Sequence, residues 1–313
     1  MARIGIMLEG QEDLTWERFF RLADAVEALG FESLFRSDHL VTFGAHRQRE
    51  TLELWTSLTA LALRTRRLRF GPLVCSMTFR QPALVAKKAA AIDQLSGGRF
   101  ELGLGAGWFT GEHRMFGIPF PPFATRLEML DEGAQVVKAL WTGQRVSFTG
   151  QHYRLEDADT HPSPLQNPPP LIMGGKGERT LHIIAQHATE WNFTYAPIGV
   201  FIEKQRRLDE ACAAIGRDPK TITRSIMIPF VIGKDAAALQ KRIDAQRAMF
   251  PDLPSTHADW LAAGYLGGSP AQLIDHIQER EAVGLSRFML QHNSLDDLDS
   301  LELLAREVLP QVV

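Results

Sequence analysis

Short apolar runs alternate along this chain with longer stretches in which apolar residues recur at helical spacing. Ile4 to Leu8 is a run typical of a buried strand, and Leu14 to Leu29 then repeats apolar residues on one helix face. Gly30 stands where a glycine commonly ends a helix, and Phe31 to Phe35 is the next apolar run. The chain is therefore expected to begin with a strand, a helix and a second strand.

The same alternation continues to the end of the chain and predicts eight strands. These strands are expected at Ile4–Leu8, Phe31–Phe35, Leu68–Val74, Arg99–Leu104, Leu171–Met173, Thr189–Phe193, Thr223–Val231 and Leu285–Leu290. Helical patterns fill the gaps, for example at Ala83–Leu95, Ala124–Trp141 and Ile198–Ile215. Repeated strand–helix alternation favours a parallel sheet, and eight strands favour a closed barrel over an open sheet. The expected fold class is α/β, a (β/α)₈ TIM barrel formed by one domain over residues 1–313.

Two segments interrupt this pattern and are expected to be insertions in the barrel. Residues 142–168 contain a predicted hairpin, Arg145–Phe148 with Gln151–Leu155, followed by a proline-rich connection. Residues 234–268 are expected to form additional helices and loops. Neither segment shifts the composition, so neither indicates a second domain.

Composition narrows the function classes. The chain has 313 residues, 45% of them hydrophobic, which is enough for one large core. A net charge of −3 offers no basic surface for nucleic acid. No stretch approaches the roughly 20 apolar residues of a membrane span. Cys75 and Cys212 have neither metal-like spacing nor a disulfide framework, so we expect a cytoplasmic protein without a metal site.

The barrel prediction directs the search for chemistry to the residues that follow each strand, because TIM-barrel active sites lie at the C-terminal strand ends. Asp38 and His39 follow the second predicted strand. A histidine side chain can both accept and donate a proton near neutral pH, so His39 is a candidate general acid or base. The alternative is a histidine that only bonds loop backbone, and position alone leaves both interpretations open.

A glycine-rich segment, Gly103 to Trp108, follows the fourth predicted strand. It fails the dinucleotide-binding pattern, because Trp108 or Thr110 stands where the third glycine is required. Glycines allow close approach to the backbone, so the segment could receive a planar ring, or could simply pack tightly at the barrel rim.

A second glycine-rich segment, Gly174 to Thr180, follows the fifth predicted strand and leads into a helix expected near Glu178. Backbone N–H groups at a helix N-terminus bind phosphate well, and Lys176 and Arg179 add positive charge. It is not a Walker loop, because Gly177 follows Lys176. The segment predicts a phosphate site.

Several segments together resemble one known family. They are LGFESLFRSDHL, LSGGRFELGLGAGW, GIPFPP, LWTGQRVSFTGQHYRLEDA, PPPLIMGGKGERTL and ATEWNF, in this order along nearly the whole chain. In sequence they are similar to the luciferase-like monooxygenase superfamily, which implies a bacterial luciferase-like barrel. The run Gly105 to Phe109, with Glu112 and His113, resembles the branch that uses the deazaflavin coenzyme F420.

The resemblance implies a role for individual residues. Asp38 matches a cofactor contact and His39 the active-site histidine. The family carries a non-proline cis peptide behind the cofactor ring, which would fall at Leu73–Val74. The remaining implied cofactor contacts are Ser76, Ala106, Gly107, Gly174, Gly175, Gly177 and Glu178. The sugar-phosphate dehydrogenases of this superfamily have an acidic residue after the glycine that matches Gly107. Here it is Trp108, which indicates a more apolar or aromatic substrate pocket.

These observations lead to one main hypothesis and two alternatives. The main hypothesis is hydride transfer between coenzyme F420 and a small organic substrate, with His39 as the catalytic residue. The second is an FMN-dependent monooxygenase, since both cofactors share a tricyclic ring and a ribityl phosphate. The third is a non-catalytic flavin-binding protein. The expected partner is a small-molecule substrate, and the sequence leaves open whether the protein forms a homodimer.

Overall fold

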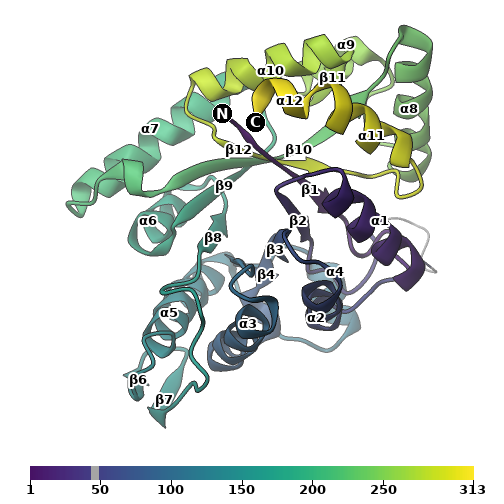
Figure 1. The fold of residues 1–313 in the computed structure, drawn as a ribbon. Coiled ribbons are helices and arrows are strands. Elements are labelled where there is room, and N and C mark those ends of the chain that lie inside the picture. The colour runs from purple at the N-terminus through teal and green to yellow at the C-terminus, as the bar shows by residue number, and fades with distance from the viewer. Residues whose placement is uncertain (44–48) are drawn as a thin grey trace.

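The computed structural model of the chain describes residues 1–43 and 49–313. A parallel sheet lies at its centre and helices lie outside it (Figure 1). The strands of this sheet are β1 (Arg3–Leu8), β2 (Ser33–Arg36), β3 (Arg69–Pro72), β4 (Cys75–Ser76), β5 (Leu102–Gly105), β8 (Leu171–Gly174), β9 (Glu190–Thr194), β10 (Thr223–Ile232), β11 (Leu266–Gly268) and β12 (Arg287–Gln291). Their order is β3-β2-β1-β12-β10-β9-β8-β5-β4, with β11 paired to β10.

The two ends of that order meet. β3 and β4 are successive pieces of chain on either side of Leu73 and Val74, and Phe70 of β3 bridges Phe100, just before β5. The sheet therefore curls into a barrel, and the predicted TIM-barrel class is confirmed. The predicted strand Leu68–Val74 corresponds to β3, which ends at Pro72, and the short strand β4 begins just after the predicted range.

The helices that cover the barrel occupy most of the remaining chain. They are α1 (Trp16–Ala28), α2 (Leu54–Arg64), α3 (Pro82–Ser96), α4 (Thr110–Met115), α5 (Phe123–Leu140), α6 (Glu178–His187), α7 (Ile198–Ala214), α8 (Ala236–Met249), α9 (His257–Ala262), α10 (Pro270–Ala282), α11 (Leu298–Glu307) and α12 (Leu309–Val312), with short 3₁₀ helices η1 (Met77–Phe79) and η2 (Pro219–Thr221). No helix in the described part of the chain is long and apolar enough to cross a membrane.

Helix α1 shows how local sequence sets these boundaries. The Thr15 side chain accepts a hydrogen bond from the Arg18 amide and caps the N-terminus, which satisfies one free N–H group. Phe19, Leu22, Ala23 and Val26 are all buried along one face. The helix ends at Ala28, two residues before Gly30, whose φ of 83° suits glycine.

The predicted insertions contain regular structure. β6 (Val146–Thr149) and β7 (Arg154–Ala158) pair antiparallel, so the predicted hairpin is confirmed, and it projects at the lower left of Figure 1. Residues 234–268 contain α8 and α9, as expected for added helices, and also strand β11, which was not expected.

The interior of the barrel holds its own apolar cluster. Met7, Phe35, Leu73, Ile172 and Met289 pack together, separately from the larger core between sheet and helices. They come from or directly follow five different strands, as expected for one layer of a filled barrel. The middle of the barrel is thus filled with side chains rather than forming a pore.

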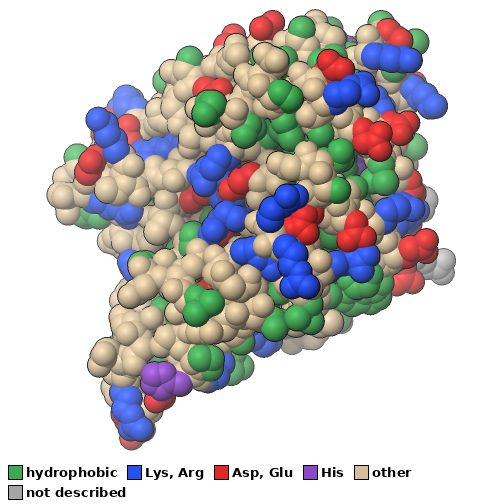
Figure 2. All heavy atoms as spheres, in the orientation of Figure 1, with side chains coloured by type: hydrophobic (Ala, Val, Ile, Leu, Met, Phe, Trp, Pro, Cys, Tyr) green, Lys and Arg blue, Asp and Glu red, His purple; other side chains and the backbone are tan. Residues whose placement is uncertain are grey.

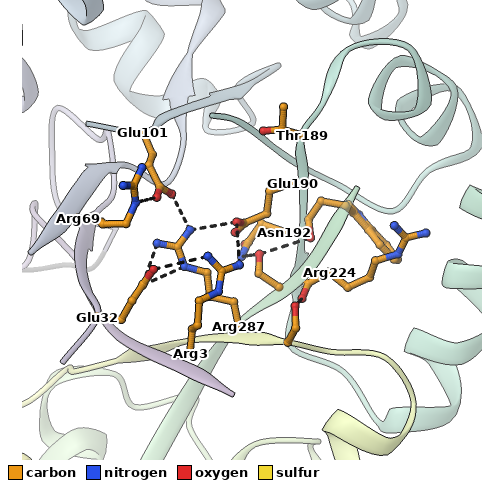
Figure 3. Close-up of polar contacts among 12 residues, drawn as sticks. Arg3, Glu32, Arg69, Glu101, Thr189, Glu190, Asn192, Arg224 and Arg287 are labelled. Carbon is orange, nitrogen blue, oxygen red and sulfur yellow. Dashed lines mark hydrogen bonds and ion pairs between the residues drawn. The ribbon is translucent and has the colours of Figure 1, made fainter. Parts of the chain in front are cut away.

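A cluster of buried ions closes the end of the barrel where the strands begin (Figure 3). Arg287, the first residue of β12, is fully buried. Its guanidinium donates to Glu101 at 2.5 Å, to Glu190 at 3.0 Å and to Glu32 at 2.9 Å. Arg3 and Arg69, the first residues of β1 and β3, complete the cluster.

The three carboxylates and three guanidinium groups of this cluster balance in charge. Burial raises the pKa of Glu190, and the nearby Glu101 carboxylate adds to this effect. Burial also opposes ionisation of Glu101, but Arg287 and Arg69 outweigh it and lower the pKa of that carboxyl. The cluster lies at the N-terminal ends of the strands, so it is suited to holding the barrel closed.

Charged side chains are mixed over the visible face of the molecule. In Figure 2, Lys and Arg side chains alternate with Asp and Glu side chains across the middle of that face. The drawn residues of this face therefore form no extended basic surface of the kind that nucleic acid requires.

Candidate active site

A cavity of about 870 Å³ opens at the other end of the barrel, where the strands finish. Its wall includes the last or nearly last residues of several strands, among them Met7, Gly105, Gly174, Thr194 and Gln291. Small-molecule pockets span roughly 300–1,000 Å³, so this cavity has room for a cofactor ring system together with a small substrate.

The structure brings nearly all of the predicted site residues to this cavity. Its wall includes Asp38, His39, Leu73, Val74, Ser76, Ala106, Gly107, Gly174, Gly175 and Gly177. The Leu73–Val74 peptide bond is cis, as the family resemblance implied. Glu178 does not line the cavity: its side chain is 61% exposed and lies 3.9 Å from Arg207. These placements leave the functional role of each residue a prediction.

His39 is held by a carboxylate that the sequence did not reveal as its partner. Its Nδ1 lies 3.0 Å from Oε1 of Glu112, in the first turn of α4, and the Leu40 amide donates to the other oxygen at 2.8 Å. Glu112 is almost fully buried. Because the carboxylate accepts, a neutral His39 carries its hydrogen on Nδ1 and leaves Nε2 available to a ligand.

Aromatic rings surround this histidine. The ring centroids of Phe43 and Trp108 lie 4.5 Å and 5.6 Å from that of His39, and Phe109 packs against both aromatic neighbours. Trp108 is 63% exposed and lines the cavity. An aromatic surface of this kind suits an apolar or planar substrate group, in agreement with the interpretation of Trp108 from the sequence.

The carboxylate of Asp38 is occupied by groups of the protein itself. Its Oδ1 accepts from Arg80 at 2.9 Å, and its Oδ2 accepts from the Ser76 amide at 2.9 Å and from Arg80. Burial opposes the charge of Arg80, but Asp38 outweighs this and raises the pKa of the guanidinium. Asp38 therefore anchors the segment at Ser76 on the cavity wall.

The turn predicted to bind phosphate has the expected form. Helix α6 begins at Glu178 with Gly177 as its N-cap, so free N–H groups lie at the cavity edge. Gly175 has a φ of 132°, which favours glycine, whereas Gly177 has an ordinary φ of −78°. Lys176 lines the cavity, while Arg179 lies 3.4 Å from Glu128 and is not part of the wall.

One buried polar atom in the wall lacks a partner among the described residues. Gln291 donates from Nε2 to Glu9 at 2.7 Å, which turns its Oε1 away from Glu9. That Oε1 atom is buried and accepts no hydrogen bond. Since buried acceptors are normally satisfied, a ligand with an N–H or O–H donor would fit here. No group of three or more His, Cys, Asp or Glu in the described ranges could hold a metal ion.

Comparisons with known proteins identify the family of this chain and proteins that share its fold. The family model described as luciferase-like monooxygenase matches residues 1–287. The chain is 27% identical to an FMNH(2)-dependent dimethylsulfone monooxygenase of Pseudomonas putida, over 96% of this chain and 88% of that protein. It is also 27% identical to an F420-dependent hydroxymycolic acid dehydrogenase of Mycobacterium tuberculosis, over 75% of this chain but only 64% of that protein.

Solved structures show the same fold. An F420-dependent secondary alcohol dehydrogenase in complex with an F420-acetone adduct superposes with a TM-score of 0.87. The two sequences are 21% identical, and the match covers 100% of this chain and 99% of the other. The monooxygenase RslO1 from Streptomyces bottropensis superposes with a TM-score of 0.83 at 22% identity, over 99% of this chain and 100% of the other.

Proposed function

This chain belongs to the luciferase-like monooxygenase family, and on that premise we propose that it is an oxidoreductase that transfers a hydride between coenzyme F420 and a small organic substrate. The observation that carries the proposal is the His39–Glu112 pair on the wall of the barrel cavity. A second support is the sequence of the segment from Gly105 to His113, which resembles the F420-dependent branch.

The residues of the cavity fit such a cofactor. Leu73 and Val74 would support one face of the ring, and Ala106 and Gly107 would let it approach the backbone closely. The turn at Gly175 and Gly177, with Lys176, would hold the phosphate. The unpartnered Oε1 of Gln291 would accept a hydrogen bond from the cofactor or the substrate.

Bound coenzyme F420 would supply or accept the hydride. When a hydride adds to a carbonyl carbon, a proton adds to the oxygen; when a hydride leaves an alcohol carbon, the hydroxyl loses its proton. His39 is the residue suited to move that proton at Nε2. Glu112 would hold the imidazole in one orientation, with its hydrogen on Nδ1 and Nε2 facing the ligand. The rings of Phe43 and Trp108 would offer an apolar surface to the substrate beside His39.

An FMN-dependent monooxygenase is the second candidate. It is favoured by the FMNH(2)-dependent relative, which matches 96% of this chain. The ring and phosphate positions proposed for F420 could also receive FMN, so the choice between the two cofactors rests on measured affinity.

Titration of the purified protein with coenzyme F420 and with FMN, in oxidised and reduced forms, tests the proposal. We expect F420 to bind at least tenfold more tightly, or about 1.4 kcal/mol. Equal affinity or a preference for FMN would overturn the F420 assignment in favour of the monooxygenase. Binding without turnover of any alcohol or carbonyl compound would favour a non-catalytic flavin-binding protein.

A further inference from the structure

Three side chains form a hydrogen-bonded chain that leads from the cavity wall to a second histidine. The hydroxyl of Ser76, on the wall, lies 2.7 Å from that of Thr78, which lies 2.6 Å from Nε2 of His113. The Nδ1 atom of His113 lies 2.8 Å from the carbonyl oxygen of Phe109. Exposure is 6% for Ser76, 9% for Thr78 and 1% for His113, so water has little access to the chain.

The partners fix the direction of these hydrogen bonds. The Phe109 carbonyl can only accept, so Nδ1 of His113 carries a hydrogen. The His113 ring lies between those of Phe79 and Phe120, with centroid distances of 4.6 Å and 4.4 Å, and both of its nitrogens contact neutral groups, the Thr78 hydroxyl and the Phe109 carbonyl.

A neutral His113 therefore presents a lone pair at Nε2, and the Thr78 hydroxyl must donate to it. With its one hydrogen committed, Thr78 can only accept from Ser76. The hydrogen of the Ser76 hydroxyl then points along the chain toward Thr78. Only lone pairs of the Ser76 oxygen remain for a ligand in the cavity.

We propose that Thr78 and His113 are positioning residues that keep Ser76 a pure hydrogen-bond acceptor toward the cofactor ring. The inference rests on the proposed function. Flavin and deazaflavin rings both gain an N–H hydrogen on two-electron reduction. An oxygen that only accepts favours the form with the additional donor, so Ser76 makes the site bind reduced cofactor more tightly than oxidised cofactor.

The neighbouring backbone is shaped around this pair of hydroxyls. A Cβ atom on Gly107 would lie 2.6 Å from the Ser76 oxygen and 2.8 Å from the Thr78 oxygen. The φ of Gly107 is 71°, a conformation that suits glycine. Gly107 thus leaves the room in which the two hydroxyls meet, next to a predicted ring contact.

The test compares Thr78→Val, which removes the hydroxyl and keeps the shape, with the conservative variant Thr78→Ser. Dissociation constants are measured for oxidised and reduced cofactor, with F420 and with FMN. We expect wild type and Thr78→Ser to prefer reduced cofactor to the same degree. In Thr78→Val, the ratio of the dissociation constant of oxidised cofactor to that of reduced cofactor should fall at least tenfold. A tenfold fall lowers the two-electron midpoint potential of the bound cofactor by about 30 mV. Ser76→Ala, if Thr78→Val does not fold, should lose the preference as well.

A second measurement does not depend on the cofactor. Nitrogen-15 NMR of His113 in the free protein should show a neutral ring with its hydrogen on Nδ1. An Nε2–H tautomer or an imidazolium would overturn the direction of the chain. Equal weakening of both redox states by Thr78→Val, or no change in either, would overturn the positioning role. If wild type binds neither F420 nor FMN, the proposed function fails, and the cofactor part of this inference fails with it. The NMR result still decides the direction of the hydrogen bonds in that case.

Discussion

Glu112 holds His39 through a contact of 3.0 Å between Oε1 and Nδ1, and its second oxygen accepts from the amide that follows His39. One buried carboxylate therefore fixes both the imidazole and the loop that carries it. A carboxylate in this position orients the ring and selects its tautomer, as the general acid–base role proposed for His39 requires.

The first prediction concerns His39 itself. His39→Asn should lower kcat by about 10²-fold, because it removes the group proposed to move a proton at the substrate. Cofactor affinity should change much less, since the ring and phosphate contacts remain. Steady-state kinetics and cofactor titration check both parts. Near-normal turnover would make His39 a structural residue.

The second prediction concerns the coupling of Glu112 to His39. Glu112→Gln should lower kcat by about tenfold, since a neutral amide accepts weaker hydrogen bonds than a carboxylate and would hold the His39 imidazole less firmly. The double variant should be no slower than His39→Asn alone, because groups that act as one unit are not additive. Multiplicative losses would show that Glu112 acts independently. Glu210→Gln, at an exposed position of α7, is the matched control.

The sequence predicted the eight principal strands because each is a buried apolar run bounded by helical spacing. Strand β11 was not predicted, and the reason is physical. Leu266–Gly268 contains two glycines and pairs only with the last three residues of β10, from Phe230 to Ile232. So short a segment owes its strand conformation to its neighbour, and no periodicity reveals it.

Position on the cavity wall was predictable for residues that follow strands or match family segments, as with His39, Ser76 and Gly175. Glu112 was not recognised as the partner of His39, because it lies 73 residues away and no local pattern relates the two. The buried cluster around Arg287 was also missed. Charged residues at strand starts are usually solvated, and only closure of the barrel makes them converge.

The third prediction concerns the proposed phosphate turn. Gly175→Val should weaken cofactor binding at least tenfold while the protein stays folded, because valine disfavours the φ of 132°. Its Cβ would also lie 2.6 Å from Thr180 Cγ2, so the Thr180 side chain would have to move. A cofactor fragment without phosphate should bind wild type and variant equally. Parallel loss of both ligands would mean that the turn supports the fold instead.

Gly177→Ala separates phosphate contact from backbone strain in the same turn. Gly177 has a φ of −78°, and its added Cβ would approach only Thr180 Oγ1, at 3.7 Å. The fold should therefore tolerate alanine, and a drop in affinity confined to phosphate-bearing ligands would place the phosphate beside this residue. Gly199→Ala, on α7 with open space around it, is the control.

The fourth prediction concerns the ion cluster at the closed end of the barrel. Arg287→Met should lower the free energy of unfolding by about 3–5 kcal/mol, because it leaves Glu101 and Glu190 buried without their shared cation. Urea unfolding measures the loss, and Arg306→Met, at an exposed position, is the control. A loss below about 1 kcal/mol, the range of a surface ion pair, would contradict a structural role for the cluster.

The last prediction concerns His292, which directly follows β12 and is 2% exposed. Its Nε2 has no partner among the described residues, and its ring stacks on Phe230. Burial lowers the pKa of His292 to about 4; Arg242 acts in the same direction and Asp297 opposes it. The unfolded chain keeps a pKa near 6.5, so between these values it binds the proton more readily than the folded protein.

The contribution of neutral His292 to the free energy of unfolding is therefore fully present above pH 6.5. It is lost as the pH falls toward 4, to a total of about 3 kcal/mol. His292→Phe preserves a planar ring against Phe230 but cannot bind a proton. From pH 7.5 to pH 5, the free energy of unfolding of wild type should fall by about 2 kcal/mol more than that of the variant. Carboxylates titrate in both proteins and cancel in the difference. Parallel curves would mean that His292 binds its proton equally well folded and unfolded, and that the ring is hydrated in the native barrel.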